Sequence, residues 1–259
     1  MPPVLEVFAV EGLPEVEPGT DLPALIAAGI ADTVAADPRL AALRPDDVVV
    51  VTSKVVSKAE GAFVDLRTVE PRPEAVAFGE RWGRDPRQVE VVLREARRVV
   101  RMGNGVIITE TRHGFVCANG GVDASNVGPE SGDVVLLLPE DPDASATAIR
   151  SAIRTRTGID VPVIVSDTFG RPWRWGVADV AIGLSGVAPL DDLRNSKDVD
   201  GRVMRTTIRA VADEIASAAE LALGKVGRRP VALVRGASPL RAEATIADVL
   251  IPTESDLFR

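Results

Sequence analysis

Three oxygen-bearing side chains, Ser166, Asp167 and Thr168, stand together in the second half of the sequence. They follow an apolar run at residues 161–165 that predicts a buried strand, and we expect this strand to end where they begin. A carboxylate beside hydroxyl groups at the tip of a strand suits a hard metal ion, which prefers oxygen ligands. The pattern therefore predicts a cation site that is shared with phosphate or carboxylate oxygens of a ligand.

Two arginines follow this polar group in a predicted turn. Arg171 and Arg174 lie close to Gly170 and Pro172, and glycine and proline favour turns. Guanidinium groups bind phosphate and carboxylate oxygens, so we predict that both arginines clamp an anionic substrate. The alternative is a solvated turn between two strands. Two of the three tryptophans of the chain lie in the same turn, which argues for a packing or binding role.

A second polar set follows another predicted strand. Four valines at residues 48–51 indicate a buried strand. The side chains after it carry hydroxyl and ammonium groups, which could cradle phosphates: Thr52, Ser53, Lys54, Ser57 and Lys58. A solvated strand end is an equally good explanation, because lysine is common on every protein surface.

A glycine-rich loop is the third candidate. Gly120 and Gly121 let the backbone approach a ligand closely, and Asp123 and Asn126 supply a carboxylate and an amide. Alone, this pattern is weak evidence, since Asp and Gly also form turns for conformational reasons. The single histidine, His113, is interpreted as a turn residue and not as a catalytic base.

Composition limits the chemistry. The single Cys117 and single His113 exclude an internal disulfide, a cysteine-rich zinc site and a histidine cluster, so a metal must be held mainly by oxygen. A formal net charge of −8 argues against a general nucleic-acid surface. No stretch approaches the roughly 18 apolar residues of a membrane span. The acidic amino terminus is not a secretory signal, and we expect a cytoplasmic protein.

The remaining pattern predicts an α+β fold, with mixed sheets and packed helices in one domain, residues 1–259, of two interleaved lobes. We expect helices from about 22 to 36 after a cap at Asp21, between 70 and 100, from 144 to 158 after a cap at Asp143, and from 206 to 223. Further strands are expected on either side of His113, at 134–138, near 177 and at 231–234, and a mobile charged loop at 191–202. No dinucleotide fingerprint or Walker A motif occurs.

Five motifs in this order resemble those of the coenzyme F420-0:γ-glutamyl ligase family. They are LPEV at 13–16, TSKVVSKAEG at 52–61, ANGGVDASNVG at 118–128, LLPEDPDASA at 137–146 and SDTFGRPWRWG at 166–176. The resemblance covers almost the whole chain, and SDTFGRPWR is not a generic pattern. The family includes stand-alone ligases and the amino-terminal domain of a longer actinobacterial protein, and both possibilities stay open.

The resemblance implies a GTP-dependent ligase that joins L-glutamate to the phospholactyl carboxylate of coenzyme F420-0 and then adds further glutamates through γ-linkages. It also implies an intertwined homodimer that uses Mn²⁺ or Mg²⁺, assisted by K⁺. Residues that match the family's metal ligands are Asp123, Asp167 and, at a second metal, Thr168. Residues that match its nucleotide contacts are Leu13, Pro14, Glu15, Val16, Ser53, Lys54, Lys58, Asn126 and the segment 223–230, which begins Leu223, Gly224 and Lys225.

Lys225 departs from the family pattern, which has glutamine near the second metal. Either the second metal keeps Thr168 and water as ligands, or the Lys225 ammonium takes its place, because a protonated lysine has no lone pair for a metal.

Two other classes of function stay open from the residues alone. A metal-dependent phosphohydrolase or nucleotidyl transferase could use the same aspartates and basic turns. A non-catalytic nucleotide- or deazaflavin-binding module would bind the ligand without turnover.

Overall fold

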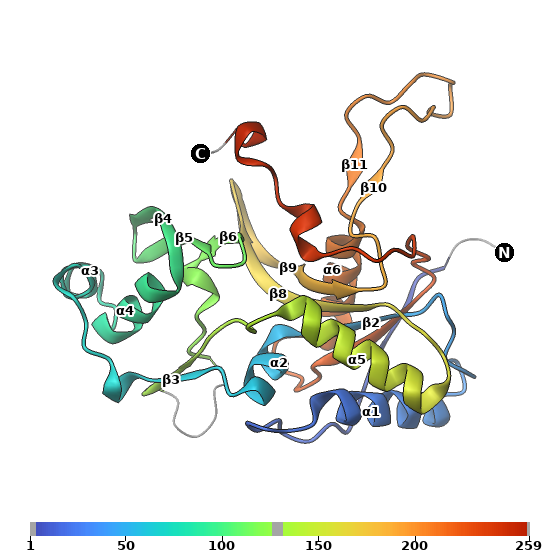
Figure 1. Cartoon of the computed structure of the whole chain (residues 1–259), viewed down its shortest axis with the longest axis horizontal. Coiled ribbons are helices and arrows are strands. Elements are labelled where there is room, and N and C mark those ends of the chain that lie inside the picture. The colour runs from blue at the N-terminus through green and yellow to red at the C-terminus, as the bar shows by residue number, and fades with distance from the viewer. Residues whose placement is uncertain (1–3, 126–131, 258–259) are drawn as a thin grey trace.

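A five-stranded mixed sheet forms the centre of the molecule in the computed structural model, which describes residues 4–125 and 132–257 (Figure 1). Its order is β1-β12-β2-β8-β9. Strands β2 and β8 are parallel, and every other neighbouring pair is antiparallel. The strands are β1 (Glu6–Ala9), β2 (Val48–Thr52), β8 (Val163–Arg171), β9 (Arg174–Ser185) and β12 (Val231–Arg235).

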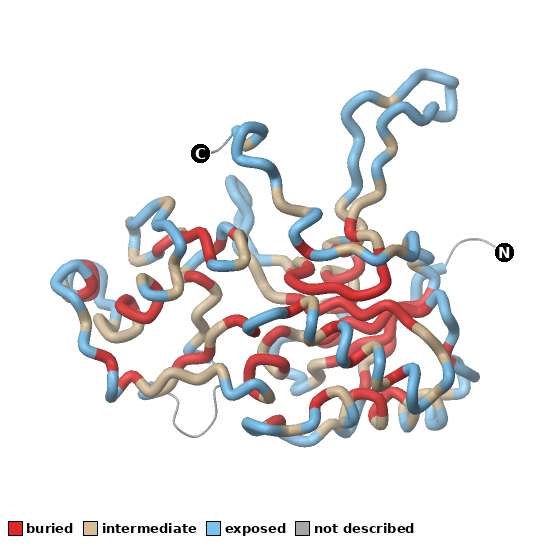
Figure 2. Tube along the Cα trace, in the orientation of Figure 1, coloured by how far each residue is buried: buried red, intermediate tan, exposed pale blue. Residues whose placement is uncertain are grey.

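Helices cover both faces of this sheet. Helices α1 (Leu22–Ala36) and α5 (Pro142–Thr157) pack against each other on one face, with α5 against β8 and β9, and α6 (Val211–Leu223) covers the other face (Figure 1). Short α2 (Ser53–Glu60) follows β2 directly. The buried part of the chain is concentrated in the central strands between these layers (Figure 2).

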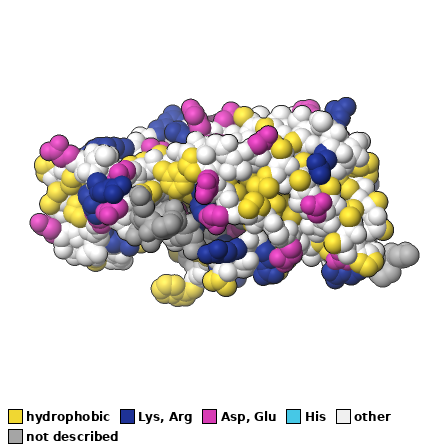
Figure 3. Space-filling model, turned by 90° about the horizontal axis from the view of Figure 1, so that it is seen from below, with side chains coloured by type: hydrophobic (Ala, Val, Ile, Leu, Met, Phe, Trp, Pro, Cys, Tyr) yellow, Lys and Arg dark blue, Asp and Glu magenta, His cyan; other side chains and the backbone are white. Residues whose placement is uncertain are grey.

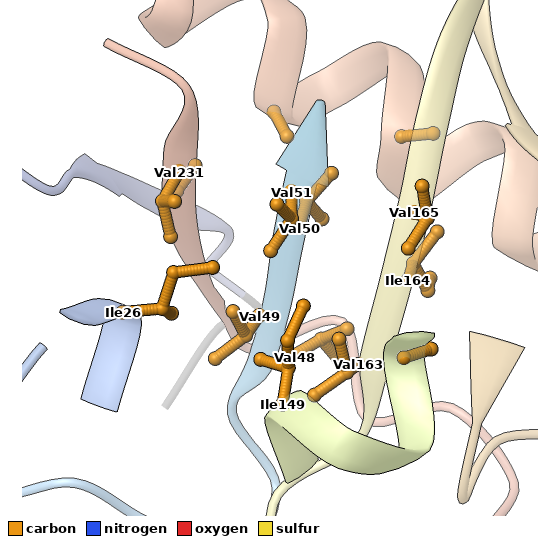
Figure 4. Packing of buried hydrophobic residues seen from close by; sticks show 14 of the residues in the cluster. Ile26, Val48, Val49, Val50, Val51, Ile149, Val163, Ile164, Val165 and Val231 are labelled. Carbon is orange, nitrogen blue, oxygen red and sulfur yellow. The ribbon is translucent and has the colours of Figure 1, made fainter. Parts of the chain in front are cut away.

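The valine-rich strands occupy the middle layer because both of their faces are covered. Val48 to Val51 are fully buried, and their side chains pack with Ile26 of α1, Ile149 of α5 and the apolar residues of β8 (Figure 4). β-Branched side chains suit a strand that is buried on both faces. The strand predicted at residues 48–51 is therefore confirmed.

A smaller lobe lies beside the central sheet (Figure 1). The chain enters it along β3 (Phe63–Asp65) and leaves it along β7 (Val134–Leu136), which pair antiparallel. Between them lie η1 (Leu66–Thr68), α3 (Pro73–Trp82), α4 (Pro86–Glu95), the antiparallel sheet β4 (Ala96–Gly103), β5 (Val106–Thr111) and β6 (Val116–Ala118), and η2 (Asn119–Gly121). This arrangement confirms the α+β class. Interleaving of the lobes and the homodimer stay predictions.

The helix boundaries agree best with prediction where a local cap defines them. The Asp21 carboxylate accepts a hydrogen bond from the Ala24 amide at 3.1 Å, which caps α1 as predicted. Helix α5 ends at Gly158 in the left-handed region, also as predicted. Its predicted cap is wrong, because Asp141 caps it and the Asp143 carboxylate instead accepts from the Leu184 amide at 2.7 Å.

The helix predicted up to Val100 is wrong in its last part. Helix α4 ends at Glu95, and residues 96–103 form β4, which pairs with β5. The helical spacing of valines continues into β4. Residues 96–103 nevertheless form a strand because they pair with β5, and the local sequence pattern gives no sign of this partner. Arg97 and Arg98 lie within 3.5 Å of the buried Glu110 across this pair.

The segment after β9 also differs from prediction. β10 (Asp191–Asp192), at the start of the predicted loop, pairs with β11 (Ile208–Arg209), which lies where a helix was expected, and the pair forms the base of a protruding arm (Figure 1). Helix α6 starts at Val211, five residues later than expected. The chain then runs through β12 to η3 (Ile246–Val249) and η4 (Thr253–Ser255).

Glu90 ties α4 to the segment before α3 and is 3% exposed. Its carboxylate accepts hydrogen bonds from Arg72, at 2.9 and 3.0 Å, and from Arg94 at 2.8 Å. The Arg72 side chain is the main cause that lowers the pKa of Glu90 from 4.5 to about 2. The contribution of Glu90 to stability is thus present above pH 4.5 and is lost as the pH falls towards 2.

We therefore expect Glu90→Gln to lower the free energy of unfolding by about 2 kcal/mol at pH 7. Urea unfolding at several pH values measures this difference, which should shrink between pH 4.5 and 2 as the parent carboxylate becomes neutral. Glu80→Gln, an exposed change on α3, is the control and should change stability by less than about 0.5 kcal/mol. A Glu90→Gln deficit that is the same at every pH would contradict the assigned role of the charge.

Two surface properties bear on the predicted partners. Over the described ranges, no helix combines the length and apolar character that a membrane span needs. Figure 3 shows the molecule from the side of α1, where the described basic and acidic side chains are interspersed among hydrophobic ones.

Candidate functional site

The candidate site lies where β2 ends and β8 continues. The last residue pair of these parallel strands is Thr52 with Ser166. Beyond it, α2 begins at Ser53, while β8 runs on beside β9 to Arg171. The prediction that this strand ends at Ser166 is therefore wrong. Pairing with β9 extends it, and Pro172 lies in the following turn, where no ladder N–H group is required.

Asp167 faces the start of α2. The Ser53 hydroxyl donates a hydrogen bond to its carboxylate at 3.0 Å. The pKa of Asp167 is raised to about 6, chiefly because burial disfavours the charged form, and the negative charges of Asp179 and Asp123 also raise it. Ser53, which contacts Asp167, is followed directly in α2 by Lys54, which contacts Asp123. The structure thus places both carboxylates at the start of α2, although they are far apart in sequence, and a metal shared between them stays a prediction.

Lys54 joins the Asp123 loop to α2. Its ammonium lies 2.6 Å from an Asp123 carboxylate oxygen and donates to the Ser125 carbonyl at 2.9 Å and hydroxyl at 3.0 Å. Burial acts to raise the pKa of Asp123, but hydrogen bonds from Lys54 and Ser125 outweigh it and lower the pKa below its usual range. The polar residues after β2 and the loop that carries Asp123 are thus in contact with each other beside β8.

Lys58 is buried near the end of α2 and forms an ion pair with Glu15. The Glu15 side chain is 57% exposed, so one member of this pair faces solvent. The pair brings the predicted nucleotide segment 13–16 against α2. Within that segment Val16 is a core residue, Leu13 is partly buried and Pro14 is exposed.

A third lysine lies on the α6 side of β8 and β9. Lys225 follows Gly224, which ends α6, and its ammonium lies 2.5 Å from the Thr168 hydroxyl and 2.9 Å from the Asp179 carboxylate. Thr168 also donates to Asp179 at 2.7 Å, since these two residues are paired across the strands. Glu220 approaches the same ammonium at 3.4 Å.

Sequence reasoning missed Asp179 and Glu220. Asp179 is 3% exposed, and it is the only acidic residue in the run GVADVAIG. A lone carboxylate within a predicted buried strand needs a partner, and that signal could have identified it. Glu220 carried no comparable signal, because acidic residues are common on helix surfaces.

The two predicted arginine clamps lie at the end of the β8–β9 hairpin and are exposed. Arg171 donates to the Trp175 carbonyl at 2.7 Å. It lies four positions along the strand from Asp167, which corresponds to about 13 Å. No described contact joins either arginine to the acidic residues, so their clamping role stays a prediction. The hairpin tryptophans Trp173 and Trp175 are 82% and 99% exposed.

Three other residues predicted to contact the nucleotide are Leu223, Gly224 and Asn126. Leu223 is buried in the main core and Gly224 ends α6, so only their backbone or neighbouring side chains could meet a ligand. Asn126 lies outside the described residues.

The donor set fits a hard divalent cation that shares ligands with phosphate. Within residues 4–125 and 132–257, no three His, Cys, Asp or Glu side chains form a complete metal cage. Mg²⁺ and similar ions are commonly held by one or two carboxylates together with substrate phosphates and water. Asp123 and Asp167 provide two such carboxylates. Burial raises the pKa of the nearby Cys117 thiol to about 12, and sulfur is a softer ligand than the oxygens that Mg²⁺ and Mn²⁺ prefer.

The sequence is similar to a known protein family and to named proteins. The sequence model of a family described as F420-0:Gamma-glutamyl ligase matches residues 12–236. A protein of Methanopyrus kandleri named coenzyme F420:L-glutamate ligase is 47% identical over 92% of this chain and 89% of its own length. Proteins of the same name from Methanothermobacter thermautotrophicus and Methanocaldococcus jannaschii are 40% and 42% identical, over 98% and 82% of this chain and 99% and 84% of their own lengths.

Proposed function

The chain belongs to the F420-0:gamma-glutamyl ligase family, and we propose that it joins L-glutamate to coenzyme F420-0 with GTP as co-substrate. The first product is an amide of the phospholactyl carboxylate, further glutamates follow through γ-linkages, and GDP and phosphate are released. The observation that carries the proposal is the convergence of Lys54, Asp123 and Asp167 from three separate segments. All three positions lie within the region that matches the family.

The nucleotide is proposed to bind over α2. Lys54 and Lys58 lie on this helix, and each forms an ion pair with a carboxylate. Their ammonium groups would exchange these carboxylates for nucleotide phosphates, which carry more negative charge. The segment 13–16, Asn126 and the segment 223–230 are proposed to complete the nucleotide site. Lys58 and Glu15 already connect the first of these segments to α2.

Activation of the acceptor precedes amide formation, because a carboxylate is a poor acylating agent. Its oxygen would attack the γ-phosphorus of GTP, the bond to the bridging oxygen of GDP would break, and an acyl phosphate would form. The glutamate amine would then attack the acyl carbon and lose a proton as phosphate leaves. Lys54 and Lys58 would stabilise negative charge on the phosphates during transfer. No protein nucleophile is needed for this route.

Asp123 and Asp167 are the residues proposed to hold Mn²⁺ or Mg²⁺, with Thr168 nearby. When bound, such an ion neutralises phosphate charge and orients the phosphates. The fit rests on two neighbouring carboxylates, one of which has its pKa raised by burial and by other acids. Potassium is proposed as an assisting ion, as the resemblance implies.

A homodimer is proposed as the working unit. Trp175 and Val177 are exposed on the β8–β9 hairpin, and large exposed apolar side chains are typical of interfaces. Light scattering coupled to size exclusion should give twice the mass of one chain. Trp175→Lys should shift this mass towards one chain, whereas Lys197→Ala on the exposed arm should not. One-chain mass for the parent would contradict the dimer.

Dependence of GTP turnover on both co-substrates tests the proposed activity against its alternatives. A ligase should release phosphate only when glutamate and coenzyme F420-0 are both present. Equal phosphate release without them would indicate a phosphohydrolase. Nucleotide binding without any turnover would indicate a binding module.

A further inference from the structure

The two acidic side chains of the β8–β9 pair have different kinds of partner. Asp167 receives a hydrogen bond from the Ser53 hydroxyl, and among the described residues no lysine or arginine forms an ion pair with it. Asp179 lies on the neighbouring strand and is paired with the ammonium of Lys225. Among the described side chains, Asp167 therefore lacks a cationic partner, whereas Asp179 has one.

The position of Lys225 is fixed by three side-chain oxygens. Its ammonium lies 2.5 Å from the Thr168 hydroxyl, 2.9 Å from the Asp179 carboxylate and 3.4 Å from the Glu220 carboxylate. We call these three residues the Asp179 pocket. Asp179 is almost completely buried, while the Lys225 side chain is 52% exposed, so the cation enters the pocket from the solvent side.

The end of helix α6 places Lys225 beside the Asp179 pocket. Helix α6 packs against β9 and ends at Gly224, whose φ of 64° lies in the left-handed region. Glycine adopts this conformation without the strain of a side chain, and the chain can leave the helix at this point. A cation at the carboxyl end of a helix is also favoured by the helix dipole.

We propose that Lys225 is a built-in cation of the site, so that each chain takes one divalent ion, at Asp123 and Asp167, and none in the Asp179 pocket. The proposal rests on the proposed function only for the ion at Asp123 and Asp167. A protonated lysine has no lone pair and cannot act as a metal ligand. A divalent ion in the pocket would need the oxygens that the ammonium already holds, and the two positive charges would repel.

The charge balance of the site supports a single external ion. Lys54 neutralises Asp123 and Lys225 neutralises Asp179, whereas Asp167 has no such partner among the described side chains. An ion bound between Asp123 and Asp167 would compensate the remaining carboxylate and release Lys54 towards the phosphates. Lys225 has no corresponding reason to leave, since no other cation takes over Asp179.

Counting bound Mn²⁺ tests the proposal without any measurement of catalysis. Equilibrium dialysis with metal analysis, at saturating Mn²⁺ and with GDP present, should give one ion per chain for the parent. Lys225→Gln should give two, because an amide oxygen can coordinate a metal in the vacated pocket. Lys225→Met removes the charge with a side chain of similar length, and it should also raise the count above one. Lys197→Gln on the exposed arm is the control and should leave the count at one.

A double variant assigns the ions to their positions. Asp167→Asn alone should bring the count to zero, and Asp167→Asn with Lys225→Gln should restore one ion in the Asp179 pocket. Two ions bound by the parent, or a count that stays at one in both Lys225 variants, would overturn the proposal. A parent that binds one Mn²⁺ yet makes no glutamylated product would reject the proposed function and leave this inference standing.

Discussion

Asp167→Asn should abolish most of the ligase activity while leaving the fold intact. Asparagine has the shape of aspartate, so it can still accept the hydrogen bond from Ser53, but a neutral amide holds a divalent ion poorly. Loss of one interaction that stabilises charge in a transition state commonly costs about 100- to 1,000-fold in rate. We expect a decrease of at least this size in the initial rate of glutamate addition at saturating substrates.

Thermal unfolding separates this effect from damage to the fold. Without metal, the variant should melt at or above the temperature of the parent, because the pKa of Asp167 is raised to about 6 and its charged form destabilises the folded state at pH 7. Mn²⁺ should raise the melting temperature of the parent but not that of the variant. Asp200→Asn, at an exposed position on the arm, should behave like the parent. Near-normal activity of Asp167→Asn would reject the metal assignment.

Lys58→Met should weaken GTP binding more than it weakens binding of the deazaflavin acceptor. Methionine keeps the buried apolar stem and removes only the ammonium, which is proposed to bind the nucleotide phosphates. Loss of a charged hydrogen bond of about 1.5 to 3 kcal/mol corresponds to a rise in the Kd for GTP of roughly 10- to 100-fold. Isothermal titration calorimetry measures this change directly.

The ion pair between Lys58 and Glu15 gives a second variant for comparison. Glu15→Gln leaves Lys58 in place and removes its carboxylate partner, which is itself largely exposed. If phosphates replace this carboxylate, Glu15→Gln should keep or improve the affinity for GTP. Lys197→Met is the control for a lost surface charge. An unchanged GTP affinity in Lys58→Met would place Lys58 outside the nucleotide site.

The sequence predicted the elements that are defined by local signals. Asp21 and Gly158 limit helices through hydrogen bonds and backbone preferences within a few residues, and both boundaries were correct. The valine run of β2 was likewise correct. Two of the errors occur where a partner strand decides the outcome. Pairing with β5 converted the expected end of a helix into β4, and pairing with β9 extended β8 beyond Ser166.

The candidate site shows the same division. Asp123, Asp167 and Lys54 were selected from the sequence by residue type and by their place near predicted strands, and the structure brings them together. Asp179 was missed because its role depends on the register that places it opposite Thr168. The contact of Lys225 with Thr168 spans 57 residues, and only the packing of α6 against β9 creates it.

Mass spectrometry of the deazaflavin product measures directly whether the protein adds glutamate to coenzyme F420-0. The protein would be incubated with coenzyme F420-0, L-glutamate, GTP and Mn²⁺, and the coenzyme would be analysed for added glutamyl units. We predict the addition of one and then further glutamyl units, with loss of the product when GTP or glutamate is omitted. If the protein binds GTP and Mn²⁺ but the mass of the coenzyme stays unchanged in the complete mixture, the proposed ligase activity is contradicted.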